Sequence, residues 1–202
     1  MKVAFDEHVP LAMVRVFQLL SAERKFKTFS GGLTVEHAKD FAPNPNDPDF
    51  DRGSDVPWIR RFASAGGKII ISGDTAMMKQ DHERLALLQT DMIVIFFGSE
   101  WSNWKFHRKC ALLLNWWMAI VATSQRAKPA SFWRIPTTWE RDGNLHEMPT
   151  FNKKLIKQEL QKAAQSEIAE RRRAKRQAAS FADLPDLFDQ SEGNPIKSKP
   201  KA

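Results

Sequence analysis

Residues 68–74 read Lys-Ile-Ile-Ile-Ser-Gly-Asp and form the clearest β-strand pattern in the chain. Three consecutive isoleucines leave no polar face, which is typical of a strand buried on both sides in a parallel sheet. A helix is predicted just before it, over about residues 55–65, because Ser54 suits an N-cap, Pro57 fits the first turn and a Gly-Gly pair follows. The stretch therefore predicts a helix that leads into a central strand, with Asp74 at the carboxyl end of that strand.

Further strands and helices alternate on both sides of this stretch. Apolar spacing predicts strands over residues 2–6, 25–29, 92–97 and 131–135, helices over about residues 11–24, 76–88 and 102–123, and a proline- and aspartate-rich loop over residues 41–54. This order predicts an α/β fold with a mostly parallel central sheet and right-handed crossovers.

Composition excludes several classes of protein. The chain has 202 residues, a net charge of +7 and one cysteine, Cys110, so it has neither an internal disulfide nor a multi-cysteine zinc site. It contains no apolar run long enough for a transmembrane helix, and its N-terminal residues do not resemble a signal peptide. We therefore expect no membrane association and a cytoplasmic location.

The charge is concentrated toward the C-terminus, which suggests the domain boundaries. Residues 151–202 hold 12 lysines and arginines against 7 acidic residues. We expect a folded domain over residues 1–140, a linker over 141–151, a basic helix over 152–180 and a disordered tail over 181–202. The basic helix, with Arg171, Arg172 and Arg173, is predicted to bind phosphates or an acidic partner; a solvated extension explains it equally well.

Three aspartates are predicted to meet at one edge of the sheet. Asp6 ends the first strand, Asp74 ends the central strand, and Asp55 begins the helix that leads into that strand. Carboxylates brought together repel one another unless a cation lies between them, and oxygen ligands favour Mg²⁺ or Mn²⁺. This arrangement predicts metal-assisted hydrolysis of phosphodiesters. The alternative is that these aspartates only cap helices and close turns.

Other residues near these acids have two interpretations each. His8 suits a phosphate contact or a proton carrier, or else an ordinary surface turn. Arg60, Arg61 and Lys79 suit an RNA backbone contact, or else a solvated helix face. The tryptophans between Trp101 and Trp117 fit a core or a dimer interface better than base stacking.

Two segments resemble the motifs of PIN-like domains. Residues 55–74 show an acid that opens a helix, then a strand, then Ser-Gly-Asp, and residues 5–10 (Phe-Asp-Glu-His-Val-Pro) resemble the first motif of that family. Downstream, residues 115–117 and 132–136 are similar to a subgroup related to VapC toxins. The resemblance covers about residues 1–140 and implies a three-layer PIN-like fold.

The resemblance also implies an activity and a set of site residues. It implies a Mg²⁺- or Mn²⁺-dependent endoribonuclease, often the toxin of a toxin–antitoxin pair and often a homodimer, with RNA and an antitoxin protein as partners. Asp6, Asp55 and Asp74 correspond to the catalytic, metal-binding acids, Glu7 is expected to support them, and Asp91 and Asp81 are candidates for a fourth acid. The alternative is an inactive PIN-like module that binds nucleic acid or a protein through its basic C-terminal extension.

Overall fold

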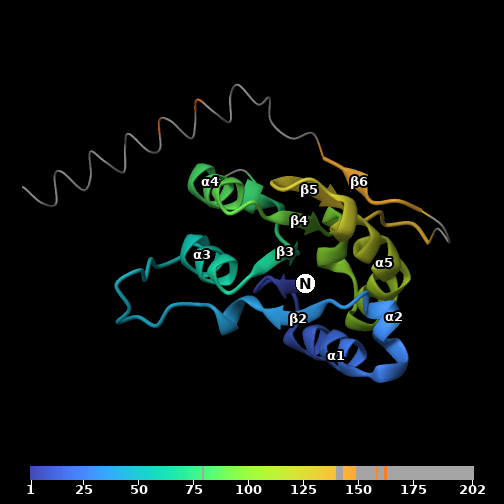
Figure 1. The fold of residues 1–202 in the computed structure, drawn as a ribbon. Helices are drawn as coiled ribbons and strands as arrows, with labels where there is room; N and C mark the ends of the chain where they lie inside the picture. The colour runs from blue at the N-terminus through green and yellow to red at the C-terminus, as the bar shows by residue number, and fades with distance from the viewer. Residues whose placement is uncertain (79, 140–142, 149–157, 159–161, 163–202) are drawn as a thin grey trace, which may run out of the picture. The chain divides into compact units, whose positions relative to one another are not determined.

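The computed structural model describes residues 1–78, 80–139, 143–148, 158 and 162 (Figure 1). The strands are β1 Lys2–Phe5, β2 Thr34–His37, β3 Gly67–Ser72, β4 Ile93–Phe96, β5 Ser131–Arg134 and β6 His146–Glu147. The α-helices are α1 Leu11–Ala22, α2 Lys27–Ser30, α3 Val56–Ser64, α4 Asp81–Gln89 and α5 Phe106–Arg126, and the 3-10 helices are η1 Arg24–Phe26, η2 Ala38–Asp40, η3 Thr75–Met78 and η4 Ser99–Asn103.

The strands form one six-stranded sheet in the order β2-β1-β3-β4-β5-β6. The first five strands are parallel, and only β6 is antiparallel to its neighbour β5. The mostly parallel α/β fold predicted from the sequence is therefore confirmed. The chain moves from β1 to one neighbour, β2, and later to the other neighbour, β3, so a topological switch point lies between β1 and β3. In open α/β sheets, ligands bind outside the carboxyl ends of the strands at such a point.

Helices cover both faces of the sheet (Figure 1). On one face, α1 and α5 pack on the side chains of Val3, Ile69 and Ile93 and on other residues of the main hydrophobic cluster. The other face is covered by α3 and α4, which contact each other. The isoleucines of β3 are completely buried, as their sequence pattern predicted. No helix among the described residues combines the length and the apolarity that crossing a membrane requires.

The prediction of a strand over residues 25–29 is wrong. This segment forms η1 and α2 instead, and the strand comes later, over Thr34–His37. The alternation of residues 25–29 suits a strand, but Phe26 is 43% exposed and does not contribute to the core. Gly31 ends α2 with a left-handed backbone, and its N–H donates to the carbonyl of Thr28. The segment therefore forms a short helix that ends at Gly31. The strand that follows, β2, places Val35 in the core.

The other predicted elements are present with shifted ends, and residues 41–54 contain the predicted loop. The sequence did not predict the short strand β6, which lies in the segment expected to be a linker. The basic helix over 152–180 and the tail over 181–202 lie outside the described residues apart from positions 158 and 162, so those boundaries stay predictions.

Candidate metal and phosphodiester site

Asp6 occupies the switch point at the carboxyl end of β1. Its backbone N–H donates to the carbonyl of Ile71 at 3.0 Å, which continues the pairing with β3 one residue beyond the strand. The side chain is fully buried. The Ser72 hydroxyl donates to Asp6 Oδ2 at 2.6 Å, whereas Asp6 Oδ1 is buried and has no hydrogen-bond partner among the described residues. A buried carboxylate oxygen without a hydrogen-bond partner destabilises the folded protein unless a donor or a cation binds it.

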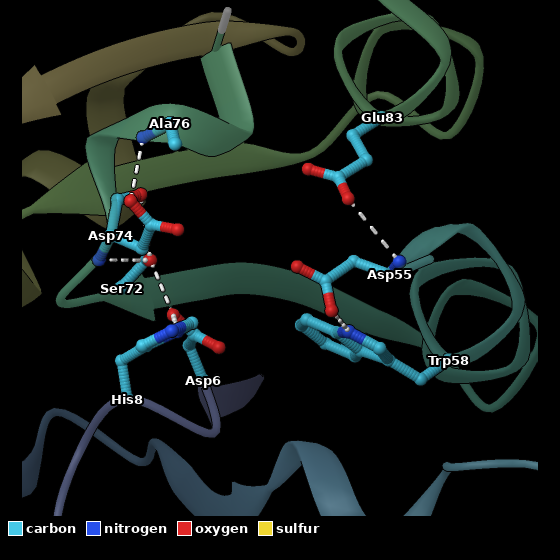
Figure 2. Close-up of polar contacts among 8 residues, drawn as sticks. All are labelled: Asp6, His8, Asp55, Trp58, Ser72, Asp74, Ala76 and Glu83. Carbon is cyan, nitrogen blue, oxygen red and sulfur yellow. Dashed lines mark hydrogen bonds and ion pairs between the residues drawn. The ribbon is translucent and has the colours of Figure 1, made fainter. Parts of the chain in front are cut away.

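Asp74 lies beside Asp6 at the end of the next strand, and Ser72 connects them (Figure 2). The Asp74 N–H donates to Ser72 Oγ at 2.9 Å, and Asp74 Oδ1 accepts from the N–H of Ala76 at 2.7 Å. These contacts fix one oxygen of Asp74 in the turn that opens η3. Asp74 Oδ2 accepts no hydrogen bond from the part of the chain that the structure describes. Gly73 allows this turn to approach His8, because a Cβ at Gly73 would lie 3.3 Å from the His8 Cβ.

Asp55 comes from the other side of the site, at the start of α3. The Trp58 indole donates to Asp55 Oδ1 at 2.9 Å, one turn further along the helix. Burial raises the pKa of Asp55, the Trp58 hydrogen bond opposes that shift, and the charges of Asp6 and Glu7 add to it. The Asp55 carboxylate is therefore held in place and lies in the field of other negative charges.

Glu83 is a fourth acid at the site, and the sequence analysis did not identify it. It lies on α4, its side chain is 4% exposed, and its Oε1 is 3.4 Å from the backbone nitrogen of Asp55. Burial raises the pKa of Glu83, and the Asp55 charge contributes to the same shift. The available signal was its spacing: Glu83 lies three and four residues before the buried Ala86 and Leu87, so it occupies the buried face of the helix.

His8 is the basic residue of this group. Its Nδ1 is 3.2 Å from Asp6 Oδ2, and 60% of its side chain is exposed. Burial on its own would lower the pKa of His8, but Asp6, with Asp74 and Asp55, more than offsets this, and the pKa is raised. The neighbouring carboxylates therefore favour the protonated form of His8 at the rim of the site.

Figure 2 shows the arrangement as two pairs. Asp6 and Asp74 lie together at the ends of β1 and β3, and Asp55 and Glu83 lie across from them on α3 and α4. The three aspartates predicted from the sequence are thus brought to one edge of the sheet, as expected from parallel strands.

Three predicted acids are not part of these pairs. Asp81 is exposed and pairs with Arg84 at 2.7 Å. Glu7 is adjacent to Asp6 in the chain, but it is exposed and acts on Asp55 only through its charge. Asp91 precedes β4, at the amino end of a parallel strand and hence at the opposite edge of the sheet, where it is exposed and adopts a left-handed backbone. The structure thus corrects the expectation that Asp91 serves as the fourth acid at the site, and Glu83 lies there instead.

The predicted cations also have different environments. Arg61 is bound to Asp47 at 2.7 Å and to Asp49, so it closes the loop over residues 41–54. Arg60 is exposed and has no ion-pair partner among the described residues. Lys79, Arg171, Arg172 and Arg173 lie outside the described residues.

The donor atoms are of the kind that Mg²⁺ and Mn²⁺ prefer. All four acids offer oxygen, and the unsatisfied Asp6 Oδ1 is an acceptor that a cation would satisfy. Among the described residues, however, no three His, Cys, Asp or Glu side chains are already arranged to hold a metal ion. The residues fit such an ion in chemistry, with Asp6, Asp55 and Asp74 as candidate ligands and Glu83 behind Asp55.

Comparison with known proteins gives one match. Residues 1–99 match the sequence model of a family described as a PIN-like domain. Searches of curated proteins and of solved structures gave no significant match. The matched range contains all four acids of the site and the strands β1–β4 that position them. The α/β fold with its mostly parallel sheet is consistent with this family, and the match supports a PIN-like family for the part of the chain that carries the site.

Proposed function

We propose that this protein is a Mg²⁺- or Mn²⁺-dependent endoribonuclease that hydrolyses RNA phosphodiester bonds. The observation that carries the proposal is Asp6: a fully buried carboxylate with one unsatisfied oxygen, at the switch point of a parallel sheet and beside Asp74. The nuclease-type fold of the matched family and the oxygen-only donor set support the same conclusion.

In this proposal each residue of the site has a role. Asp6, Asp55 and Asp74 would hold the cation, and a bound cation would make a water molecule more acidic and offset the charge that develops on the phosphate. Trp58 and Glu83 position Asp55 through its carboxylate and its backbone N–H, respectively. His8 lies at the rim with its Nδ1 toward Asp6, so its protonated ring attracts the phosphate and is available to move a proton.

The resemblance to VapC-related proteins also suggests a role for the protein in the cell. We propose a toxin that acts on RNA in the cytoplasm, that pairs with an antitoxin protein and that forms a homodimer. Growth arrest on induced expression, lost with Asp74→Asn, is the expected result. Normal growth at a confirmed level of wild-type protein would contradict the toxin role without bearing on the nuclease itself.

The nuclease proposal is tested by incubating the full chain with an end-labelled RNA pool in Mn²⁺, in Mg²⁺ and in EDTA. We expect cleavage that requires metal and falls at least 100-fold in Asp74→Asn. The matched control is Asp91→Asn, the same substitution at an exposed site on the opposite edge, which should cleave like the wild type. If the folded wild type cleaves neither RNA nor DNA, the proposal fails and a binding module becomes the better reading.

A further inference from the structure

A cationic patch lies at the same edge of the sheet as the acids. It comprises Lys105 and the first residues of α5, Phe106–Lys109, with the sequence Lys-Phe-His-Arg-Lys. Lys105, His107 and Arg108 are exposed, and Phe106 is 44% exposed. Because α5 connects the parallel strands β4 and β5, its first turn lies at the carboxyl edge, where Asp6 and Asp74 also lie.

A ladder of aromatic rings connects this patch to the site. We define the aromatic ladder as Phe97, Trp101 and Trp104. The Phe97 N–H donates to the carbonyl of Ser72, whose hydroxyl binds Asp6. Phe97 stacks on Trp101 with centroids 4.0 Å apart, and Trp101 stacks on Trp104 at 5.5 Å. The ladder therefore begins beside the acids, in the core, and ends at Trp104.

Arg108 lies on the outer end of the aromatic ladder. Its Cζ is 4.0 Å from the centroid of the Trp104 ring, a distance at which a guanidinium binds an aromatic face. Trp104 thus has Trp101 stacked against it and Arg108 over its ring, so it holds a cation rather than a base. Stacking restricts the guanidinium before any ligand arrives, and a planar guanidinium binds a phosphate through two parallel hydrogen bonds.

The other cations of the patch are available to a ligand. Within the described part of the chain, Lys105, Arg108 and Lys109 form no ion pair, and no acidic residue occurs from Trp101 to Lys109. Three uncompensated cations beside an exposed phenyl ring match the chemistry of single-stranded nucleic acid, with phosphates for the cations and a base for the ring.

We propose that the cationic patch binds the phosphates of single-stranded RNA and holds the strand against the acidic site, with Arg108 as its fixed anchor and Phe106 as a base platform. This inference rests on the proposed function, because it names the surface by which that site receives its substrate. The residues of the cationic patch thereby gain a binding role, although they lie outside the group of acids. The aromatic ladder connects the patch to those acids.

The chain contains a matched control for this patch. Arg24, Lys25 and Lys27 are three exposed cations beside Phe26, which is 43% exposed, whereas in the patch Lys105 and Arg108 are exposed and Lys109 is half-buried. They follow α1 and precede β2, which places them at the amino edge of the sheet, away from the acids. Composition and exposure are therefore nearly the same in the two clusters, and only their position and the anchoring of Arg108 differ.

The test measures binding of a fluorescent single-stranded RNA by anisotropy, in EDTA, with the full chain. Changing Lys105, Arg108 and Lys109 together to Gln should weaken binding at least tenfold and reduce the slope of log K against log salt by about 2, from three lost phosphate contacts. The triple Gln variant of Arg24, Lys25 and Lys27 should bind within about threefold of wild type. Arg108→Lys keeps the charge and loses the planar guanidinium stacked on Trp104. Its RNA affinity should lie between those of the wild type and the triple variant of the patch.

Two results would overturn the inference: equal losses in both triple variants, which would reflect net charge alone, or no loss in the patch variant. Thermal melts establish that each variant is folded. Because binding is measured without metal, a protein that binds RNA through the patch but cleaves nothing contradicts only the proposed function. A protein that cleaves RNA, but whose binding ignores the patch, contradicts only this inference.

Discussion

Asp6 combines a favourable position for chemistry with an unfavourable position for stability. Its carboxylate is fully buried, and Ser72 satisfies only one of its oxygens. An unmet buried acceptor costs about 1–3 kcal/mol, and more when it is charged. Sites that bind a cation carry such a cost in its absence, so under the proposed function Asp6 is expected to destabilise the metal-free protein.

Asp6→Asn tests this directly, because the amide removes the buried charge and keeps the shape of the side chain. We expect its melting temperature in EDTA to equal or exceed that of the wild type, by up to about 5 °C, since a gain near 1 kcal/mol has that effect in a domain of this size. In Mn²⁺ the wild type should gain stability and Asp6→Asn should not. A large loss of stability in EDTA would mean that the carboxylate serves the fold instead.

Glu83 is the other residue whose role follows from its contacts. Its Oε1 faces the backbone nitrogen of Asp55, and its charge lies near a site that already holds three aspartates. Residues behind a metal ligand alter affinity by about 10–100-fold when they are changed. We expect Glu83→Gln, which keeps an acceptor for the Asp55 N–H, to weaken Mn²⁺ binding about tenfold while folding normally.

The matched control for Glu83 is Glu100→Gln, an exposed acid in η4. It should leave Mn²⁺ affinity unchanged. Equal affinities for Glu83→Gln and the wild type, measured by calorimetry, would remove Glu83 from the site.

At the scale of elements, the loop over residues 41–54 leads to Asp55, and one arginine holds this loop in place. Arg61 on α3 binds both Asp47 and Asp49, and these hydrogen bonds lower the pKa of each carboxyl. A group whose pKa is lowered on folding contributes stability above its unfolded pKa, here the ordinary value of 3.8, and loses it as the pH falls through the lower folded value.

Arg61→Met should therefore loosen the loop at neutral pH. We expect faster proteolysis within residues 41–54 and a melting temperature lower by about 1–3 °C, a small effect because the pair is exposed. The difference from the wild type should shrink in 1 M salt, and also as the pH falls from about 3.8 toward the lowered pKa values of the folded carboxyls. Arg60→Met is the control, because Arg60 is one residue away on the same helix and has no ion-pair partner in the described part of the chain. If the two variants are cleaved at the same rate, Arg61 does not hold the loop.

Sequence reasoning worked best for elements with one dominant local signal. The three isoleucines of β3 left no alternative to a buried strand, and parallel strands then required Asp6 and Asp74 to share an edge. It failed at residues 25–29, where local alternation resembled a strand but the left-handed Gly31 and the exposed Phe26 belong to a helical turn. An alternation of polar and apolar residues over only five positions does not show which side chains are buried in the core.

The acidic site shows a second limit of sequence reasoning. Asp91 was expected by its order in the chain, but a residue before a parallel strand lies at the wrong edge of the sheet. Glu83 was missed because no motif contains it and its relation to Asp55 spans 28 residues. Only the packing of α3 against α4 brings these two acids together.

For the whole molecule, the parallel sheet and its switch point explain why the acids, the aromatic ladder and the cationic patch lie at one edge. The carboxyl ends of β1 and β3 carry Asp6 and Asp74, and the carboxyl end of β4 carries the ladder that leads to Arg108. In the proposed function, this edge would offer a site for a cation next to a surface for a polyanion, and metal-dependent cleavage of RNA requires both.

The most direct measurement is calorimetric titration of the full chain with Mn²⁺, for the wild type, Asp6→Asn and Asp91→Asn. We expect saturable binding by the wild type and by Asp91→Asn, and affinity at least tenfold weaker in Asp6→Asn, because Asp6, alone among the described residues, brings a buried, unsatisfied oxygen to the switch point. Equal affinities in all three proteins, or no binding by the folded wild type, would contradict the metal site on which the proposed function depends.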